Sequence, residues 1–159
     1  MFPAIICRMT SKLRSPRDDA SASLERLLMG AIGVTAKALA QTPEAAELTF
    51  VQWRALVVVE SAGHMRIGEL ATRLGVAVPS ASRLARRLER HGLVTTERDE
   101  ADRRATIVRP SAAGREVRDA VLHRRRELAG AAVDGALDSA TPATAAFLAG
   151  LADAFVGLA

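Results

Sequence analysis

Four arginines lie within one thirteen-residue stretch of the chain, from Pro79 to His91. Apolar residues at helical spacing predict a helix here, and they place the polar residues together on its other side. The polar set consists of Ser82, Arg83, Arg86 and Arg90, with Arg87 on its flank. Like charges three and four residues apart repel on a helix, so this set favours an anionic partner. A phosphate backbone neutralises such charges, and arginine also suits the acceptors of guanine in the major groove. The alternative is an ordinary solvated basic face.

The other reactive side chains do not form a pattern suited to catalysis. The sequence has no nucleophile beside a base, no glycine loop that would hold a phosphate and no metal-binding triad. His64, His91 and His123 are isolated from one another, so we expect solvated histidines, no metal site and no cofactor. An enzyme is therefore not expected. Winged helices that bind only other proteins are a third class, but such a module would have a neutral face where this chain has arginines.

Positive charge is concentrated in one part of the chain. Residues 66–109 contain ten arginines and six acidic residues, and residues 1–17 contain four basic residues and no acid. Residues 18–65 and 110–159 are slightly acidic, although the whole chain has a formal net charge of +4. A positive segment in an otherwise neutral or acidic chain is typical of a protein with a polyanionic partner.

The sequence gives no sign of export or membrane insertion. The apolar stretch from Phe2 to Cys7 is too short for a signal-peptide core, and no stretch approaches the ~18 apolar residues that cross a bilayer. Cys7 is the only cysteine, which excludes an intrachain disulfide framework and fits a reducing compartment. We therefore expect a cytoplasmic protein.

The elements that would position the arginines are mostly helical. Alanine and leucine dominate, and β-branched runs late in the chain lie at 95–96 and 106–108, so we expect a mainly α protein with one small hairpin. Thr49 is the predicted N-cap of the second helix, whose buried stripe would contain Val51, Ala55, Leu56 and Val59. Gly75 is predicted to end the third helix, and Ser111 to cap the fifth. The predicted helices are 18–40, 49–61, 67–74, 79–91, 111–132 and 141–158, with strands at 93–98 and 104–108.

Residues 48–114 resemble the DNA-binding core of the multiple antibiotic resistance regulator (MarR) family. The resemblance rests on the order and spacing of several short motifs. They are Phe50–Leu56 (FVQWRAL), Glu69–Val76 (ELATRLGV), Pro79–Leu84 (PSASRL), Arg87–Val94 (RLERHGLV), Asp102–Ala105 (DRRA) and Ser111–Gly114 (SAAG). The flanking helices fall where this family has its dimerisation helices. The resemblance implies a winged helix-turn-helix with dimerisation helices at both ends of the chain.

The resemblance also implies roles for individual residues. Ser80, Ser82 and Arg83 match positions of the recognition helix that approach bases and phosphates. Asp102 and Arg104 match a wing motif in which the arginine enters the minor groove and the aspartate orients its guanidinium. Arg103 is an alternative to Arg104 in that role, and a surface turn with an exposed ion pair is the alternative for the whole motif.

Three positions depart from the family pattern. Ala77 and Val78 replace polar or basic residues that are common just before Pro79, so the recognition helix lacks a side-chain N-cap. Gly68 stands where relatives often have Ser or Thr, and Pro110 replaces a leucine after the second wing strand. These differences leave the fold intact but affect the DNA sequence that the protein would bind.

Many members of the family bind small aromatic acids between the dimerisation helices and the winged module. For such an aromatic or phenolic effector, the candidate pocket residues are Trp53, Arg54 and His64, with a purely structural Trp53 as the alternative. Some relatives sense peroxide through a cysteine supported by tyrosines. Cys7 lies outside the predicted first helix and the chain has no tyrosine, so we expect a thiol without this role.

We therefore expect a sequence-specific, DNA-binding transcriptional regulator. It would be a repressor that binds a pseudo-palindromic operator as a homodimer and is released by a small ligand. The expected organisation is a basic, disordered arm at 1–17, an N-terminal dimerisation helix at 18–48, a winged helix-turn-helix at 49–110 and C-terminal dimerisation helices at 111–159.

Overall fold

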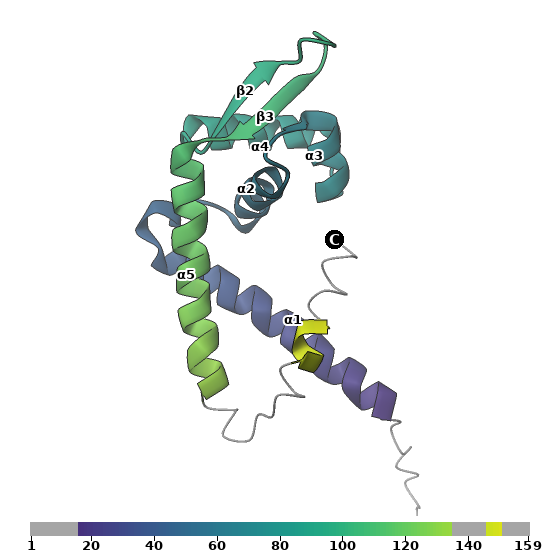
Figure 1. Cartoon of the computed structure of the whole chain (residues 1–159), viewed down its shortest axis with the longest axis vertical. Coiled ribbons are helices and arrows are strands. Elements are labelled where there is room, and N and C mark those ends of the chain that lie inside the picture. Colours follow the sequence, from purple (N-terminus) through teal and green to yellow (C-terminus); the bar gives the residue numbers. More distant parts are fainter. Residues whose placement is uncertain (1–15, 135–145, 151–159) are drawn as a thin grey trace, which may run out of the picture. The chain divides into compact units, whose positions relative to one another are not determined.

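The computed structural model describes residues 16–134 and 146–150 (Figure 1). Most of the predicted N-terminal arm, including Cys7, lies outside these ranges. The predicted helix at 141–158 is described only at residues 146–150, which are helical. Contacts divide the chain into two compact units, residues 1–33 and 34–159, which are treated separately below.

The first unit contains most of helix α1 (Pro16–Gln41). Asp18 and Asp19 lie in its first turn, where carboxylates complement the positive end of the helix dipole. Large apolar side chains of this part of the helix are open to solvent within one subunit. These are Leu27, Leu28, Met29 and Ile32.

The second unit contains the predicted helix-turn-helix, formed by α3 (Ile67–Leu74) and α4 (Val78–Arg90). Gly75 ends α3 in the left-handed conformation, with φ at 69°, which residues with a Cβ rarely adopt. The short turn that follows brings α4 across α3. Both apolar stripes that the sequence predicts point inward, because α3 buries Ile67, Leu70, Ala71 and Leu74 and α4 buries Ala81, Ala85 and Leu88.

Helix α2 (Phe50–Ala62) packs on both of these helices and supports them. Its N-terminus has the predicted cap: Gln52 N donates to Thr49 Oγ1 at 3.3 Å, and Thr49 N donates to Gln52 Oε1 at 2.7 Å. The predicted buried stripe was correct for Ala55, Leu56 and Val59 but wrong for Val51. Val51 lies in the first turn of α2 and is 49% exposed, because the helix enters the core only from Gln52 onward.

A three-stranded antiparallel sheet lies against the helix-turn-helix, with strand order β1-β3-β2. Strands β2 (Val94–Arg98) and β3 (Thr106–Pro110) form the predicted hairpin, in which Thr96 is paired with Val108. The hairpin turn projects at the top of Figure 1. The third strand, β1 (Met65–Arg66), was not predicted, because two residues are too few to show an alternating pattern. It joins the start of α3 to β3.

Helix α5 (Ala112–Asp134) begins directly after the sheet. Ser111 caps it as predicted, because its Oγ accepts a hydrogen bond from Gly114 N at 2.9 Å. The Ser111 hydroxyl also donates to the Gly92 carbonyl at 2.6 Å, which fixes the helix start to the turn after α4. Further along, Arg118 Nη1 bonds Glu60 Oε2 of α2 at 2.8 Å. A short 3₁₀ helix, η1 (Pro43–Ala45), connects α1 to α2. None of the helices in the described ranges is long and apolar enough to cross a membrane.

Candidate nucleic-acid interface

The four arginines of α4 lie on its exposed side. Arg83, Arg86, Arg87 and Arg90 are all exposed, whereas the residues between them at helical spacing are buried against α2, α3 and β2. Ser80 and Ser82 are half-buried at the edge of the same side. Ser80 Oγ accepts a hydrogen bond from Arg83 Nη2 at 3.0 Å, so these two predicted site residues are in direct contact.

The arginines of the described residues fall into groups with different partners. Five of them form ion pairs with acidic side chains; these are Arg66, Arg73, Arg109, Arg118 and Arg124. Among the described residues, the four arginines of α4 have no acidic partner within ion-pair distance, and neither do Arg103 and Arg104 of the hairpin turn. Six guanidinium groups of this module are therefore available to an external anion.

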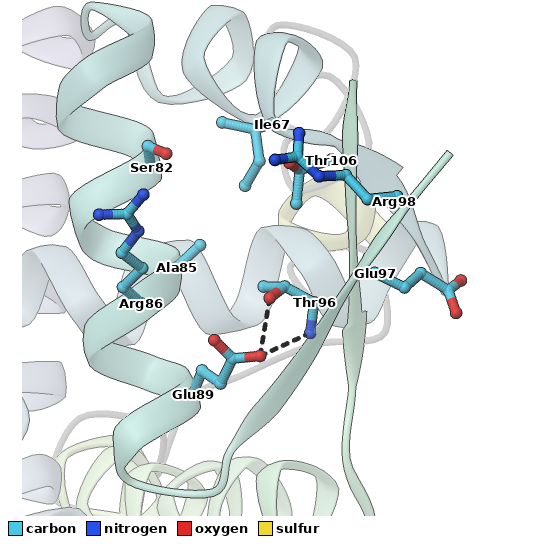
Figure 2. Close-up of a pocket in the computed structure, with 9 residues that line it drawn as sticks. All are labelled: Ile67, Ser82, Ala85, Arg86, Glu89, Thr96, Glu97, Arg98 and Thr106. Atoms are coloured by element: carbon cyan, nitrogen blue, oxygen red, sulfur yellow. Dashed lines mark hydrogen bonds between the residues drawn. The ribbon is translucent and has the colours of Figure 1, made fainter. Parts of the chain in front are cut away.

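Glu89, the acidic residue of α4, is turned away from these arginines and binds the sheet. Its Oε1 accepts from both the backbone N and the Oγ1 of Thr96, at 2.9 and 2.7 Å (Figure 2). These bonds hold β2 beside α4 at one end of a hollow of about 250 Å³. Ser82 and Arg86 line its α4 side and Arg98 lies on its sheet side, as Figure 2 shows.

A second hollow, of about 390 Å³, lies between the N-terminal ends of α3 and α4 and the hairpin turn. We call it the wing groove. Residues of β1, α3, α4 and the hairpin turn line it, and they include Arg66, Gly68, Val78, Ser82, Asp102 and Arg104. Ser82 therefore lies between the two hollows, and the fold brings residues of the predicted recognition helix and of the predicted wing motif to one surface.

The hairpin turn is organised by Asp99, which the sequence analysis did not single out. Asp99 is only 7% exposed. Its Oδ2 binds Arg66 Nε at 2.6 Å, and its Oδ1 accepts from the backbone N of Ala101 at 2.9 Å. The Ala101 N–H, followed by the Arg66 hydrogen bond, holds the pKa of Asp99 below its ordinary value. An aspartate at the first position of a turn is the sequence signal, but its pairing with Arg66 is not visible from spacing.

Asp102 fixes the backbone of the same turn. Its Oδ1 accepts from Arg104 N at 3.0 Å. The carbonyl of Arg103 accepts from Arg98 Nη1 at 3.4 Å. The backbone on both sides of Arg103 and Arg104 is thus held, while both side chains are exposed.

The three residues proposed for an effector pocket have separate surroundings. Trp53 is 4% exposed and belongs to the main core cluster. Arg54 donates to the carbonyls of Arg73 and Leu74, both at 3.3 Å, and so caps the C-terminal end of α3. His64 is exposed in the connection between α2 and β1. In the described ranges, no three His, Cys, Asp or Glu side chains are arranged to hold a metal ion.

The comparisons with known proteins agree with this geometry. Residues 46–105 match the model of the MarR family. No curated protein sequence matches the chain. Transcriptional regulator Tm0710 from Thermotoga maritima has a similar solved structure, with 27% identity, a TM-score of 0.61 and coverage of 86% of this chain and 94% of its own.

Two further solved structures are of proteins that bind DNA. FabT of Streptococcus pneumoniae, solved in complex with DNA, is 18% identical with a TM-score of 0.69, over 89% of this chain and 96% of its own. BpsR of Bordetella bronchiseptica, whose DNA binding is regulated by 6-hydroxynicotinic acid, is 18% identical with a TM-score of 0.56. That match covers 84% of this chain and 98% of BpsR.

The mainly helical fold with its small wing, predicted from the sequence, is confirmed by these structures. The residues that match the family model, 46–105, include the helix-turn-helix, strand β2 and the hairpin turn. Residues 46–105 are therefore similar to the MarR family, a family of DNA-binding transcriptional regulators and not of enzymes.

Proposed function

We propose that this protein is a DNA-binding transcriptional regulator, a homodimeric repressor that binds a pseudo-palindromic operator through α4 and the wing, and that a small aromatic or phenolic ligand releases it. Its site of action would be the cytoplasm. The observation that carries the DNA-binding part is the set of six arginines without an acidic partner on α4 and the hairpin turn. A stable protein gains little from such a surface unless phosphates neutralise it.

The proposed division of labour follows the position of each side chain. Ser80, Ser82 and Arg83 lie toward the N-terminal part of α4, the part of a recognition helix that contacts base edges. Arg86, Arg87 and Arg90 lie further along the same exposed side and would bind phosphates. Arg103 and Arg104 would enter the minor groove, with Asp102 holding the backbone that carries them.

The operator geometry depends on the dimer. In this proposal residues 49–110 bind DNA, while residues 18–48 and 111–159 form the dimer. The exposed apolar side chains of α1 support this arrangement, because a soluble subunit rarely leaves so many large apolar groups in water. Two-fold symmetry then places two recognition helices about one turn of DNA apart.

Release by a ligand is supported by the regulation of BpsR and by the position of Arg54. Since Arg54 holds the C-terminal carbonyls of α3, a ligand carboxylate that bound its guanidinium would compete with these bonds. The helix-turn-helix would then shift on α2. Trp53 and His64 remain the other candidate residues for this site.

The test is a binding assay with a duplex selected from a random pool, compared with a scrambled duplex at two salt concentrations. We expect a preference of ~10³ or more for the selected duplex and a steep salt dependence. Arg83→Ala and Arg104→Ala should each weaken binding by about 1–3 kcal/mol. Arg109→Ala is the control, because Arg109 is already paired with Glu97, which points away from the hollow in Figure 2. Equal, weak binding of both duplexes would contradict the proposal.

A further inference from the structure

Val78, the first residue of α4, has an unusual position for an apolar side chain. It is 53% exposed, and it precedes four exposed arginines on the same helix. Ala77 before it provides no side-chain hydrogen bond to the helix N-terminus. Val78 thus supplies neither a cap nor a charge at a place where a polar residue would be better solvated. The exposed apolar surface of Val78 therefore does not stabilise a single copy of the chain.

The residues near Val78 show that its side chain belongs to the wing groove. It lines the wing groove together with Ser82 and with Arg104 of the hairpin turn. Gly68 lines the same groove, and a Cβ at Gly68 would meet nothing within 4 Å, so no side chain fills the groove at this position. The groove is therefore an open surface with an apolar patch beside the exposed Arg104. Of the two acidic residues that line it, Glu69 is paired with Arg73, and Asp102 accepts from the backbone of Arg104.

A partner for this surface must offer both negative charge and a small apolar group. An apolar protein surface would have to remove water from the nearby guanidinium groups without pairing them, which is costly. Double-stranded DNA provides phosphates and, in the major groove, one apolar feature, the C5 methyl group of thymine. The first residues of a recognition helix are those that contact base edges.

We propose that Val78 is a specificity-determining residue that packs against the C5 methyl group of a thymine in each half-site. This inference rests on the proposed function, since it requires that α4 lies in the major groove. It assigns a preference for thymine over uracil and cytosine at one position. Ser82 and Arg83, one turn further along α4, would contact the neighbouring base pairs and phosphates.

The experiment removes only the methyl group. A duplex is first selected from a random pool with the wild-type protein, and each thymine is then replaced in turn by uracil, symmetrically in both half-sites. Burial of one methyl group contributes about fourfold to affinity, so uracil at the contacted position should weaken wild-type binding roughly fifteenfold over two half-sites. Val78→Ala should bind the thymine and uracil duplexes equally. Val78→Thr, which keeps a methyl group, should retain part of the preference.

Val51→Ala is the matched control, because Val51 has similar exposure but lies on α2 and does not line the wing groove. Its preference for thymine should equal that of the wild type. If no uracil substitution weakens wild-type binding, or if Val78→Ala keeps the full preference, Val78 does not contact the methyl group. If the wild type selects no sequence from the pool, the proposed function itself fails, and Val78 is better explained as a contact for a protein partner.

Discussion

Asp99 connects the two halves of the proposed DNA-binding surface. Its carboxylate holds the backbone of the hairpin turn on one side and Arg66, the residue before α3, on the other. Arg66 itself is about half exposed and lines the wing groove. This nearly buried charge therefore adds a link between the wing and the helix-turn-helix, beside the pairing of β1 with β3 and the bonds of Glu89 to Thr96.

Asp99→Asn should make the protein less stable at neutral pH, because an amide replaces the charge that binds Arg66. The pKa of Asp99 is lower in the folded protein than its ordinary value of 3.8. A lowered pKa contributes stability above the unfolded value, and the contribution is lost as pH falls through the folded value. Urea midpoints of wild type and variant should therefore differ at about pH 7 and converge as the pH falls below 3.8 through the lowered pKa of the folded protein.

Asp102→Asn provides the control for this prediction. Asp102 is exposed and bonds the backbone of Arg104. We expect its urea midpoint to stay close to that of the wild type. Equal losses for the two variants, or a difference that does not change with pH, would show that Asp99 does not act through its charge.

Single residues also show how far the sequence predicts the site. The side of α4 that carries the arginines could be predicted from the spacing of three buried residues, because residues three and four positions apart lie on the same side of a helix. The partner of Asp99 could not be predicted in this way, because Arg66 is 33 positions away and the contact depends on the tertiary fold. Val51 was wrongly predicted to be buried, because helical spacing alone does not show at which residue a helix enters the core.

At the scale of elements, α5 must start very close to the end of α4. Gly114 is buried, and a Cβ placed on it would lie 2.1 Å from the carbonyl oxygen of Leu93. Leu93 follows the turn between α4 and β2. Capping patterns predicted that a helix starts at Ser111. They do not show that Gly114, three residues later, must be a glycine for the two backbone segments to approach each other.

Gly114→Ala should separate α5 from the winged module. The nearest atoms belong to backbone that cannot rotate away, so we expect a loss of about 1–3 kcal/mol in the free energy of unfolding. Gly130→Ala is the matched control, because Gly130 lies in the same helix with nothing within 4 Å of its Cβ position. That substitution should stabilise α5 by up to about 1 kcal/mol. Denaturant unfolding of both variants gives the comparison, and a neutral Gly114→Ala would contradict the close approach.

At the scale of the whole molecule, charge and apolar surface are segregated along the chain. The excess of arginine lies in residues 66–109, within the winged module, whereas exposed large apolar residues gather in α1. The sequence predicted the excess of arginine, which requires only the order of the residues, whereas the exposure of the apolar side chains of α1 comes from the structure. The dimer geometry needs a second copy of the chain, whose contacts no single-chain pattern specifies.

The dimer proposal predicts that charge on the apolar side of α1 abolishes both assembly and DNA binding. Leu28 and Ile32, four residues apart on one side of the helix, are 42% and 50% exposed. Burial of each would contribute about 1.5–3 kcal/mol, and two-fold symmetry counts each side chain twice. The double variant Leu28→Glu with Ile32→Glu should therefore sediment as a monomer at micromolar concentration and lose most of its affinity for the selected duplex. Gly30→Glu is the control, because Gly30 lies one turn from Arg26, on the polar side of the helix, with open space at its Cβ. It should remain dimeric and bind DNA.

A double variant that stays dimeric would exclude this side of α1 from the interface. A wild-type monomer that still binds a palindromic duplex tightly would exclude the dimer itself.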